Sequence, residues 1–305
     1  MQQEDTVPEN SLVNNNSLAA DFCARYGPWA VIAGGSEGTG ESFARLLAAQ
    51  GIHLILLARR DAPLQRLKES IETEHGVMVE AVAVDLTTDH AVDTIIEVGS
   101  GKEVGLFIYN LGSNIRYARF TDWPRESLEF MIRMNCEMPV QLSHHFSQGM
   151  KQRKRGGIVF LGSLAGLAGA AYMSIYPATK AYLQILAEGL WHDLKPLGID
   201  VMCSILGATN TPSHQNMKFE ELNAGDDPSH SMAMECDDVA RETLAHLGTG
   251  PIWVVGAHNR ALLPEGFIAQ RPLAVEMMSM NTAKISGIEH TPVFAEPLAK
   301  SKKMT

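Results

Sequence analysis

The sequence lacks the features that mark a secreted, metal-binding or membrane-spanning protein. Its four cysteines, Cys23, Cys136, Cys203 and Cys236, stand far apart, and no two form the CxxC pair of a zinc site or a redox dithiol. No window reaches the roughly 18 apolar residues of a membrane span. The polar start MQQEDTVPENSLVNNNS has no basic end followed by an apolar stretch. We therefore expect reduced thiols, no metal site and a cytoplasmic protein.

Positive charge is also scarce. The chain has 25 lysine and arginine residues against 35 acidic ones, a net charge of -10, which disfavours nonspecific binding to nucleic acid or anionic lipid. The basic stretch MKQRKR (150–155) ends a predicted helix just before Gly156, where cations offset the helix dipole. Neither nucleic acid nor a membrane is expected as a partner.

Apolar, β-branched runs alternate with helical stretches along most of the chain. Parallel strands need a crossover, usually a helix, between each pair. The alternation therefore predicts an α/β protein with a doubly wound parallel sheet covered on both faces. The seven expected strands cover residues 29–35, 53–59, 77–85, 104–110, 156–163, 200–206 and 251–256.

No linker rich in Pro, Gly or Ser divides this pattern, so we expect one catalytic domain over residues 18–256. Residues 1–17 are expected to form a flexible arm, and the sequence assigns no role to the extension over residues 257–305. After the second strand, Asp61 is expected to cap a helix that Gly76 ends.

Ligands of such a sheet bind at the carboxyl ends of the strands, so the loops after the strands form the candidate site. The first loop, AGGSEGTG, places Gly34, Gly38 and Gly40 in a GxxxGxG spacing. A diphosphate can approach a backbone without side chains, and the next helix directs its free N–H groups at the phosphates. The alternative is a tight turn packed for structural reasons, which its place between the first strand and the first helix disfavours.

Charged residues at the ends of the second and third strands bear on the choice of cofactor. Arg59 and Arg60 stand where an acidic residue would bind the ribose of NAD, and arginine pairs with the 2′-phosphate of NADP. Asp85 can accept a hydrogen bond from an adenine amino group, and a helix cap by Thr87 or Thr88 nearby is the competing local role. NADP is therefore predicted, with NAD as the alternative, and solvated surface arginines would explain Arg59 and Arg60 without any cofactor.

The stretch YPATK places Tyr176 and Lys180 four residues apart, on one face of a helix that Ser174 can cap and whose first turn tolerates Pro177. An ammonium near a phenol favours the phenolate and lowers the tyrosine pKa, at about 1.4 kcal/mol per unit. Tyr176 can then give its proton to a carbonyl oxygen. A tyrosine and a lysine at this spacing are more often exposed surface residues without a catalytic role. Other motifs in the sequence are therefore needed to support a catalytic pair.

These motifs are the GxxxGxG turn, Asn110-Leu111-Gly112, Asn135 and Ser163, and with YPATK they follow the order and spacing of the short-chain dehydrogenase/reductase family over about residues 28–256. The chain thus resembles that family. The stretch RYGPWAVIAGGSEGTG is similar to the branch that reduces steroid and long-chain 3-ketoacyl substrates.

The resemblance implies a single-domain Rossmann fold and hydride exchange between a nicotinamide and a carbonyl or secondary alcohol. It implies Tyr176 as acid/base, Lys180 as its tuner, Ser163 as the carbonyl holder and Asn135 as the anchor of a water relay. It also implies a homodimer or homotetramer. The implied cofactor-binding residues are Gly34, Ser36, Gly38, Thr39, Gly40, Arg59, Arg60, Asp85, Leu86, Asn110, Gly112, Tyr176, Lys180, Thr209 and Thr211.

Three features depart from the family pattern. Glu37 stands directly before Gly38, where many NADP-preferring members carry a basic residue, so Arg59 would hold the 2′-phosphate with less help. Leu206 replaces the proline of Pro-Gly after the sixth strand, and Leu111 replaces the alanine of Asn-Ala-Gly.

The substrate is expected to be a bulky hydrophobic ketone, steroid-like or acyl-chain-like. Met217, Phe219, Met232 and Met234 lie among polar residues after Thr211, the composition of a movable lid or of methionines that pack a segment to the core. Two other functions remain open. One is a non-catalytic dinucleotide-binding sensor or scaffold, and the other is an epimerase or dehydratase with tightly held cofactor.

Overall fold

A computed structural model describes residues 15–112, 118–169, 173–212, 233–267, 270–273, 276 and 292–293. The strands are β1 (Trp29–Ala33), β2 (His53–Ala58), β3 (Val79–Ala83), β4 (Val104–Tyr109), β5 (Gly156–Ser163), β6 (Ile199–Leu206) and β7 (Ile252–Val254). The helices are α1 (Asn15–Tyr26), α2 (Gly38–Ala49), α3 (Asp61–His75), α4 (Ala91–Gly99), α5 (Arg125–Ile132), α6 (Met138–Arg153), α7 (Ile175–Leu194), α10 (Cys236–His246) and α11 (Ala257–Arg260). Shorter turns are the 3-10 turns η1 (Phe120–Asp122), η3 (Leu164–Leu167) and η4 (Lys195–Leu197), and the π-helical turn η2 (Arg133–Glu137).

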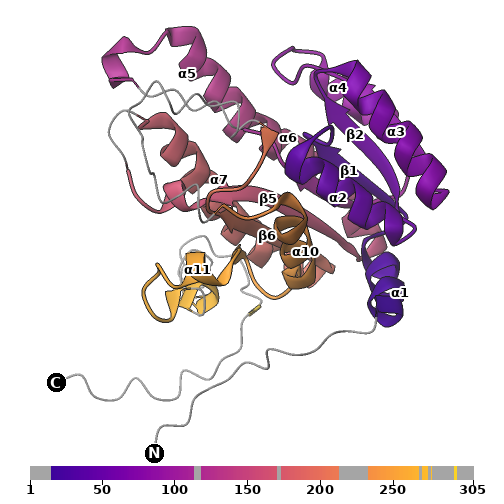
Figure 1. The fold of residues 1–305 in the computed structure, drawn as a ribbon. Coiled ribbons are helices and arrows are strands. Elements are labelled where there is room, and N and C mark those ends of the chain that lie inside the picture. The colour runs from indigo at the N-terminus through magenta and orange to yellow at the C-terminus, as the bar shows by residue number, and fades with distance from the viewer. Residues whose placement is uncertain are drawn as a thin grey trace, which may run out of the picture.

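The strands form one parallel sheet in the order β3-β2-β1-β4-β5-β6-β7. The predicted seven-stranded, doubly wound α/β fold is confirmed (Figure 1). Because β1 lies between β2 and β4, the chain leaves β1 and β4 toward opposite faces. This reversal opens a crevice at the carboxyl ends of the two strands, where ligands of such sheets bind.

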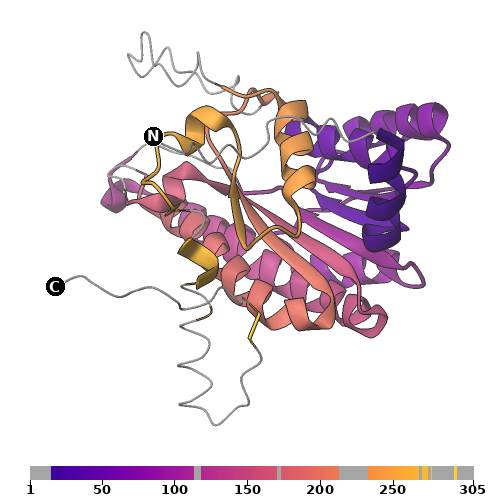
Figure 2. The same cartoon turned by 90° about the horizontal axis from the view of Figure 1, so that it is seen from below.

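Helices cover both faces of the sheet (Figure 2). Ala30 and Ile32 of β1 pack with residues of α2, α3 and α10, whereas Val31 and Ala33 pack with residues of α4, α6 and α7. A strand buried on both faces reads as a continuous apolar run, which is why the strands were visible in the sequence.

The ends of two helices test the expected caps. Gly76 ends α3 in the left-handed conformation, with φ 67°, as expected. The expected cap at Asp61 is wrong. Arg60 is the N-cap residue and Asp61 already belongs to the helix, where its Oδ1 accepts a 3.0 Å hydrogen bond from Gln65. Ser174 stands at the N-cap of α7 but makes no side-chain capping bond.

Helix α1 begins at Asn15, so the last three residues of the expected arm start a helix, and residues 1–14 lie outside the described part. Two residues of the C-terminal extension contact the second half of α7. Arg271 forms an ion pair with Glu188, and a Glu276 oxygen lies 3.4 Å from Nε2 of His192. This part of the extension therefore anchors to the helix that carries the YPATK motif.

All four cysteines are free thiols. Over the described part of the chain, no helix has the length and apolar character that crossing a membrane requires.

Candidate active site

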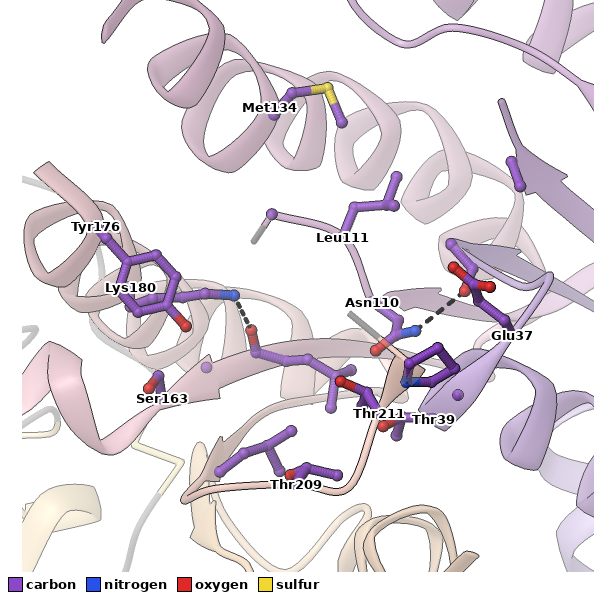
Figure 3. Close-up of a pocket in the computed structure, with 18 of the residues that line it drawn as sticks. Glu37, Thr39, Asn110, Leu111, Met134, Ser163, Tyr176, Lys180, Thr209 and Thr211 are labelled. Atoms are coloured by element: carbon purple, nitrogen blue, oxygen red, sulfur yellow. Dashed lines mark hydrogen bonds between the residues drawn. The ribbon is translucent and has the colours of Figure 1, made fainter. Parts of the chain in front are cut away.

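A cavity of about 640 Å³ lies at the carboxyl ends of the strands, where the reversal of strand order predicts a ligand. All predicted site residues line it except Gly40 and Asn135. In Figure 3, Tyr176, Lys180 and Ser163 gather at one end, and Glu37, Thr39 and Thr211 lie at the other. The cavity thus joins the glycine-rich turn to the YPATK motif.

The glycine-rich turn, called the cradle below, packs too closely against its neighbours to carry side chains at Gly34 and Gly40. A Cβ on Gly34, whose φ is +83°, would lie 2.8 Å from the Asn110 carbonyl oxygen. A Cβ on Gly40 would lie 1.8 Å from the Gly34 carbonyl oxygen, which also accepts a 3.1 Å hydrogen bond from the Asn110 amide. The turn therefore lies tightly against the start of α2.

This cradle suits a dinucleotide. Glu37 is the N-cap of α2 and makes no side-chain capping bond, so it does not compete for the first N–H groups of the helix. Those groups and the positive end of the helix dipole face the cavity end where Gly38 and Thr39 lie. The residues present therefore fit the diphosphate of a nicotinamide cofactor.

Of the two arginines after β2, Arg60 forms an ion pair with Glu37. Nη2 of Arg60 lies 2.5 Å from Oε2 of Glu37, so the acid before Gly38 engages Arg60. Arg59 lies toward Asp85, and its charge adds to the hydrogen bonds from Thr87 that hold the Asp85 pKa below its usual range. Arg59 is thus the arginine that Glu37 leaves available to a phosphate.

Asp85 organises a local turn, and the expected helix cap at Thr87 or Thr88 is wrong because His90 is the N-cap of α4. Oδ1 of Asp85 accepts hydrogen bonds from the Thr87 backbone N–H at 2.9 Å and the Thr87 hydroxyl at 2.8 Å. Asp85 also lines the cavity, so the turn that it organises is part of the wall.

Tyr176 and Lys180 lie side by side in the first turns of α7. Their side chains are 9% and 5% exposed, and Nζ of Lys180 lies 5.8 Å from the centre of the Tyr176 ring. Nζ also donates a 2.8 Å hydrogen bond to the Leu161 carbonyl, which fixes it at the end of β5. Burial lowers the pKa of Lys180 to about 8, so the side chain is mainly an ammonium at neutral pH. A cation at this place favours the phenolate of Tyr176.

Ser163 ends β5, and its hydroxyl oxygen accepts a 3.2 Å hydrogen bond from the Ala165 backbone N–H. Gln184 of α7 donates to the Ser163 carbonyl at 3.2 Å. Because one lone pair of the hydroxyl is engaged, its O–H is directed elsewhere and can donate to a ligand oxygen in the cavity.

Asn135 lies behind the cavity wall and is 1% exposed. Its amide donates a 2.9 Å hydrogen bond to the Thr179 hydroxyl, which donates at 2.9 Å to the Tyr176 carbonyl. A Cβ on Gly112 would lie 1.9 Å from the Asn135 carboxamide oxygen. Asn135 therefore connects η2 to the helix turn that carries Tyr176. The sequence analysis missed Thr179, whose position in the YPATK motif was the available signal.

The end of the cavity near Tyr176 has apolar walls that the sequence analysis also missed. Phe130 and Met173 line the cavity and pack in the cluster of Tyr176, while Leu164 follows Ser163 and Leu206 pairs with it across the sheet. The sequence pattern instead predicts apolar character in the segment after Thr211. Met217, Phe219 and Met232 lie outside the described residues, and the backbone of Met234 pairs with Ala208 and Asn210.

A comparison with known protein families shows which family shares this fold and this set of site residues. The family model described as short chain dehydrogenase matches residues 28–221. The chain belongs to this family. It is therefore an oxidoreductase of the short-chain dehydrogenase family, whose cofactor is a nicotinamide dinucleotide.

Relatives within the short-chain dehydrogenase family confirm the expected likeness to its steroid and ketoacyl branch. A 7beta-hydroxysteroid dehydrogenase of Clostridium sardiniense is 29% identical over 252 residues, 80% of this chain and 92% of that protein. A very-long-chain 3-oxoacyl-CoA reductase of Laccaria bicolor is 32% identical over 183 residues, 59% of this chain and 54% of that protein. The alignment thus spans about half the length of that reductase.

A solved short-chain dehydrogenase from Sphingobium yanoikuyae, in complex with NADPH, superposes with a TM-score of 0.66. It is 28% identical and covers 89% of this chain and 99% of that one. The shared fold extends over nearly the whole of that enzyme.

Proposed function

We propose that this short-chain dehydrogenase uses NADP(H) to interconvert a ketone and a secondary alcohol on a bulky hydrophobic substrate. The observation that carries the proposal is the buried Lys180 ammonium beside the Tyr176 ring, at the apolar end of a cavity whose other end holds the glycine-rich cradle. When bound, the cofactor supplies or accepts the hydride.

The residues of the cradle would hold the cofactor. The turn at Gly34 and Gly38 and the start of α2 would hold its diphosphate, and Arg59 would hold its 2′-phosphate. Thr211 lies against Gly38 and would contact the same part of the cofactor as the glycine-rich turn, and Thr209 is a further lining residue that would contact the cofactor. An arginine at the 2′-phosphate supports NADP over NAD because it gives a charge-assisted bond that NAD cannot make.

The chain's own residues handle the proton. The Ser163 hydroxyl donates a hydrogen bond to the substrate carbonyl oxygen, and the Tyr176 hydroxyl gives its proton to that oxygen during reduction. Lys180, held by the Leu161 carbonyl, stabilises the tyrosinate that remains. In oxidation the same groups act in reverse, with Tyr176 as the base.

The apolar walls support a large hydrophobic substrate. Phe130 of α5 and Met173 before α7 pack in the same apolar cluster as Tyr176, and both line the cavity together with Met134 of η2. Steroid ketones and 3-oxoacyl thioesters both place one carbonyl on a large apolar body, which this arrangement accommodates.

The test measures NADPH and NADH oxidation with three classes of ketone: steroid ketones, long-chain 3-oxoacyl thioesters and a small polar ketone. We expect turnover with one of the first two classes, NADPH preferred, and at least a thousandfold loss in Tyr176→Phe, because that variant has no proton to transfer. Nicotinamide fluorescence should show that the variant still binds NADPH.

Other outcomes point to the rival functions. Cofactor binding without turnover of any ketone or alcohol would favour a sensor or scaffold. Purified protein that already carries nicotinamide and consumes none during reaction would favour an epimerase or dehydratase. Activity that survives in Tyr176→Phe would show that the proposed acid is wrong.

We also propose that two copies pair through α7. Tyr182 and Ile185 of this helix are 40% and 61% exposed, and a Cβ on neighbouring Gly189 would meet nothing, so the stripe has room for a second helix. Light scattering should give a dimer or tetramer for the wild type and a smaller species for Ile185→Lys.

A further inference from the structure

The π-helical turn η2, which contains Asn135, leaves the Met134 backbone carbonyl without a hydrogen bond donor from the helix itself. In η2 the Met138 N–H donates to the Arg133 carbonyl, five residues back, in place of the Met134 carbonyl four residues back. The next residue that could reach Met134 is Pro139, which has no N–H. The Met134 carbonyl therefore has no helical donor.

Tyr109 supplies the missing donor. It is the last residue of β4, its side chain is fully buried, and its hydroxyl donates a short hydrogen bond to the Met134 carbonyl. The ring is held by edge contact with Phe107, at 6.2 Å between centroids. Burial raises the pKa of Tyr109, so the hydroxyl stays protonated and remains a donor.

This bond fixes the residue beside it. The Met134 carbonyl and the Asn135 N–H belong to one peptide group, so orienting the carbonyl also orients the backbone of Asn135. The Asn135 amide then donates to the Thr179 hydroxyl, which donates to the Tyr176 carbonyl. A buried chain of polar contacts thus runs from the end of β4 to the first turn of α7.

We infer that Tyr109 is a positioning residue whose hydroxyl stands in for the helix N–H that Pro139 lacks, and so holds the Asn135 amide against Thr179 and steadies the turn that carries Tyr176. The effect on turnover rests on the proposed ketone reduction. The effect on the η2 turn does not.

The test compares Tyr109→Phe with Tyr26→Phe. Tyr26 is a matched control because it is also buried, at 4% exposed, and its hydroxyl donates a 2.8 Å hydrogen bond to Asp200, which lies at the opposite end of the sheet from the cavity. Both variants lose one buried hydroxyl bond, so a loss of global stability alone would affect the two alike.

We expect Tyr109→Phe to lower kcat about 10- to 100-fold, since small displacements of catalytic groups cost that much, with the Kd for NADPH unchanged within about twofold. Tyr26→Phe should keep the wild-type kcat. Hydrogen exchange at residues 133–138 should be at least tenfold faster in Tyr109→Phe alone, because the turn loses its anchor.

Equal exchange at residues 133–138 in the two variants overturns the inference, as does an equal loss of kcat. If the wild type reduces no ketone but the exchange differs as expected, the proposed function fails and the anchoring of the turn by Tyr109 stands. If Tyr109→Phe does not fold, the comparison uses Tyr109→Phe with Pro139→Ala, which gives residue 139 an N–H for the Met134 carbonyl. Failure of this double variant to restore folding overturns the inference.

Discussion

Replacing Lys180 by methionine should change how the stability of the protein depends on pH. Methionine removes the charge and keeps a flexible side chain of similar length. Burial lowers the pKa of Lys180 from 10.5 to about 8, so the unfolded chain binds the lysine proton more tightly than the folded protein does. The stability of the wild type therefore rises with pH between about 8 and 10.5, relative to a variant without this lysine.

The magnitude follows from the size of the shift. A fall in the pKa from 10.5 to about 8 lowers the free energy of unfolding at neutral pH by about 3 kcal/mol, at about 1.4 kcal/mol per pKa unit. When the pH is raised from 7 to 9.5, the free energy of unfolding of the wild type should rise by about 2 kcal/mol relative to that of Lys180→Met. The variant also leaves the Leu161 carbonyl without its lysine donor, a cost that does not depend on pH and cancels in the comparison.

The assay is urea unfolding of both proteins at several pH values from 7 to 9.5, with an exposed lysine variant, Lys151→Met, as the control. The difference between wild type and Lys180→Met should change by about 2 kcal/mol over this range, while the control difference stays flat. If the difference in unfolding free energy between wild type and Lys180→Met did not change with pH, the lowered pKa of Lys180 would be refuted. The reasoning that burial brings this pKa close to neutral pH would then fail as well.

Three further substitutions test the cofactor end of the cavity. Arg59→Ala should weaken NADPH binding about 10- to 100-fold in a fluorescence titration and leave NADH nearly unchanged, since a bond to a charged group contributes about 1.5–3 kcal/mol; equal losses for both cofactors would contradict the assignment of the 2′-phosphate. Glu37→Gln should tighten NADPH binding several-fold by releasing Arg60 from its ion pair, and the gain should disappear in high salt. Gly40→Ala should abolish binding of both cofactors, because its Cβ would lie 1.8 Å from the Gly34 carbonyl oxygen, and calorimetry would show whether the fold survives; unchanged affinity would mean that the turn is more pliable than its contacts indicate.

The sequence predicted the sheet well because the strands are buried on both faces. β1 is buried at all five positions, and its short length and the glycines that follow it favour a strand over a buried helix. The ends of strands were less predictable. The third strand was expected over residues 77–85 but spans Val79–Ala83, because only those residues find partners on β2.

Helix starts were also hard to predict. The chain needs two residues to leave β2, so Arg60 adopts the extended conformation of an N-cap, with φ -97° and ψ 116°. Asp61, the better capping side chain, enters the helix one position too late to cap it. Sequence preference for a cap was overruled by where the strand ended.

In the site, too, local features could be predicted from the sequence and long-range contacts could not. The spacing of Tyr176 and Lys180 within one helix is a local property, and the sequence contained it. The contacts that fix them join distant parts of the chain: Lys180 binds a carbonyl 19 residues away, and Asn135 binds Thr179 across 44 residues. Such partners depend on how α7 packs against the sheet, which no local pattern encodes.

For the proposed cofactor NADP(H), the ion pair between Glu37 and Arg60 means that the protein carries its own competitor for the 2′-phosphate. An anion arriving at the end of β2 finds one arginine already neutralised, so part of its attraction is offset by the carboxylate beside it. The affinity for the phosphorylated cofactor then has an upper limit built into the turn. The proposed reductase would release the spent cofactor after every cycle, and such a limit favours fast exchange over tight retention. Product release is often the step that sets turnover.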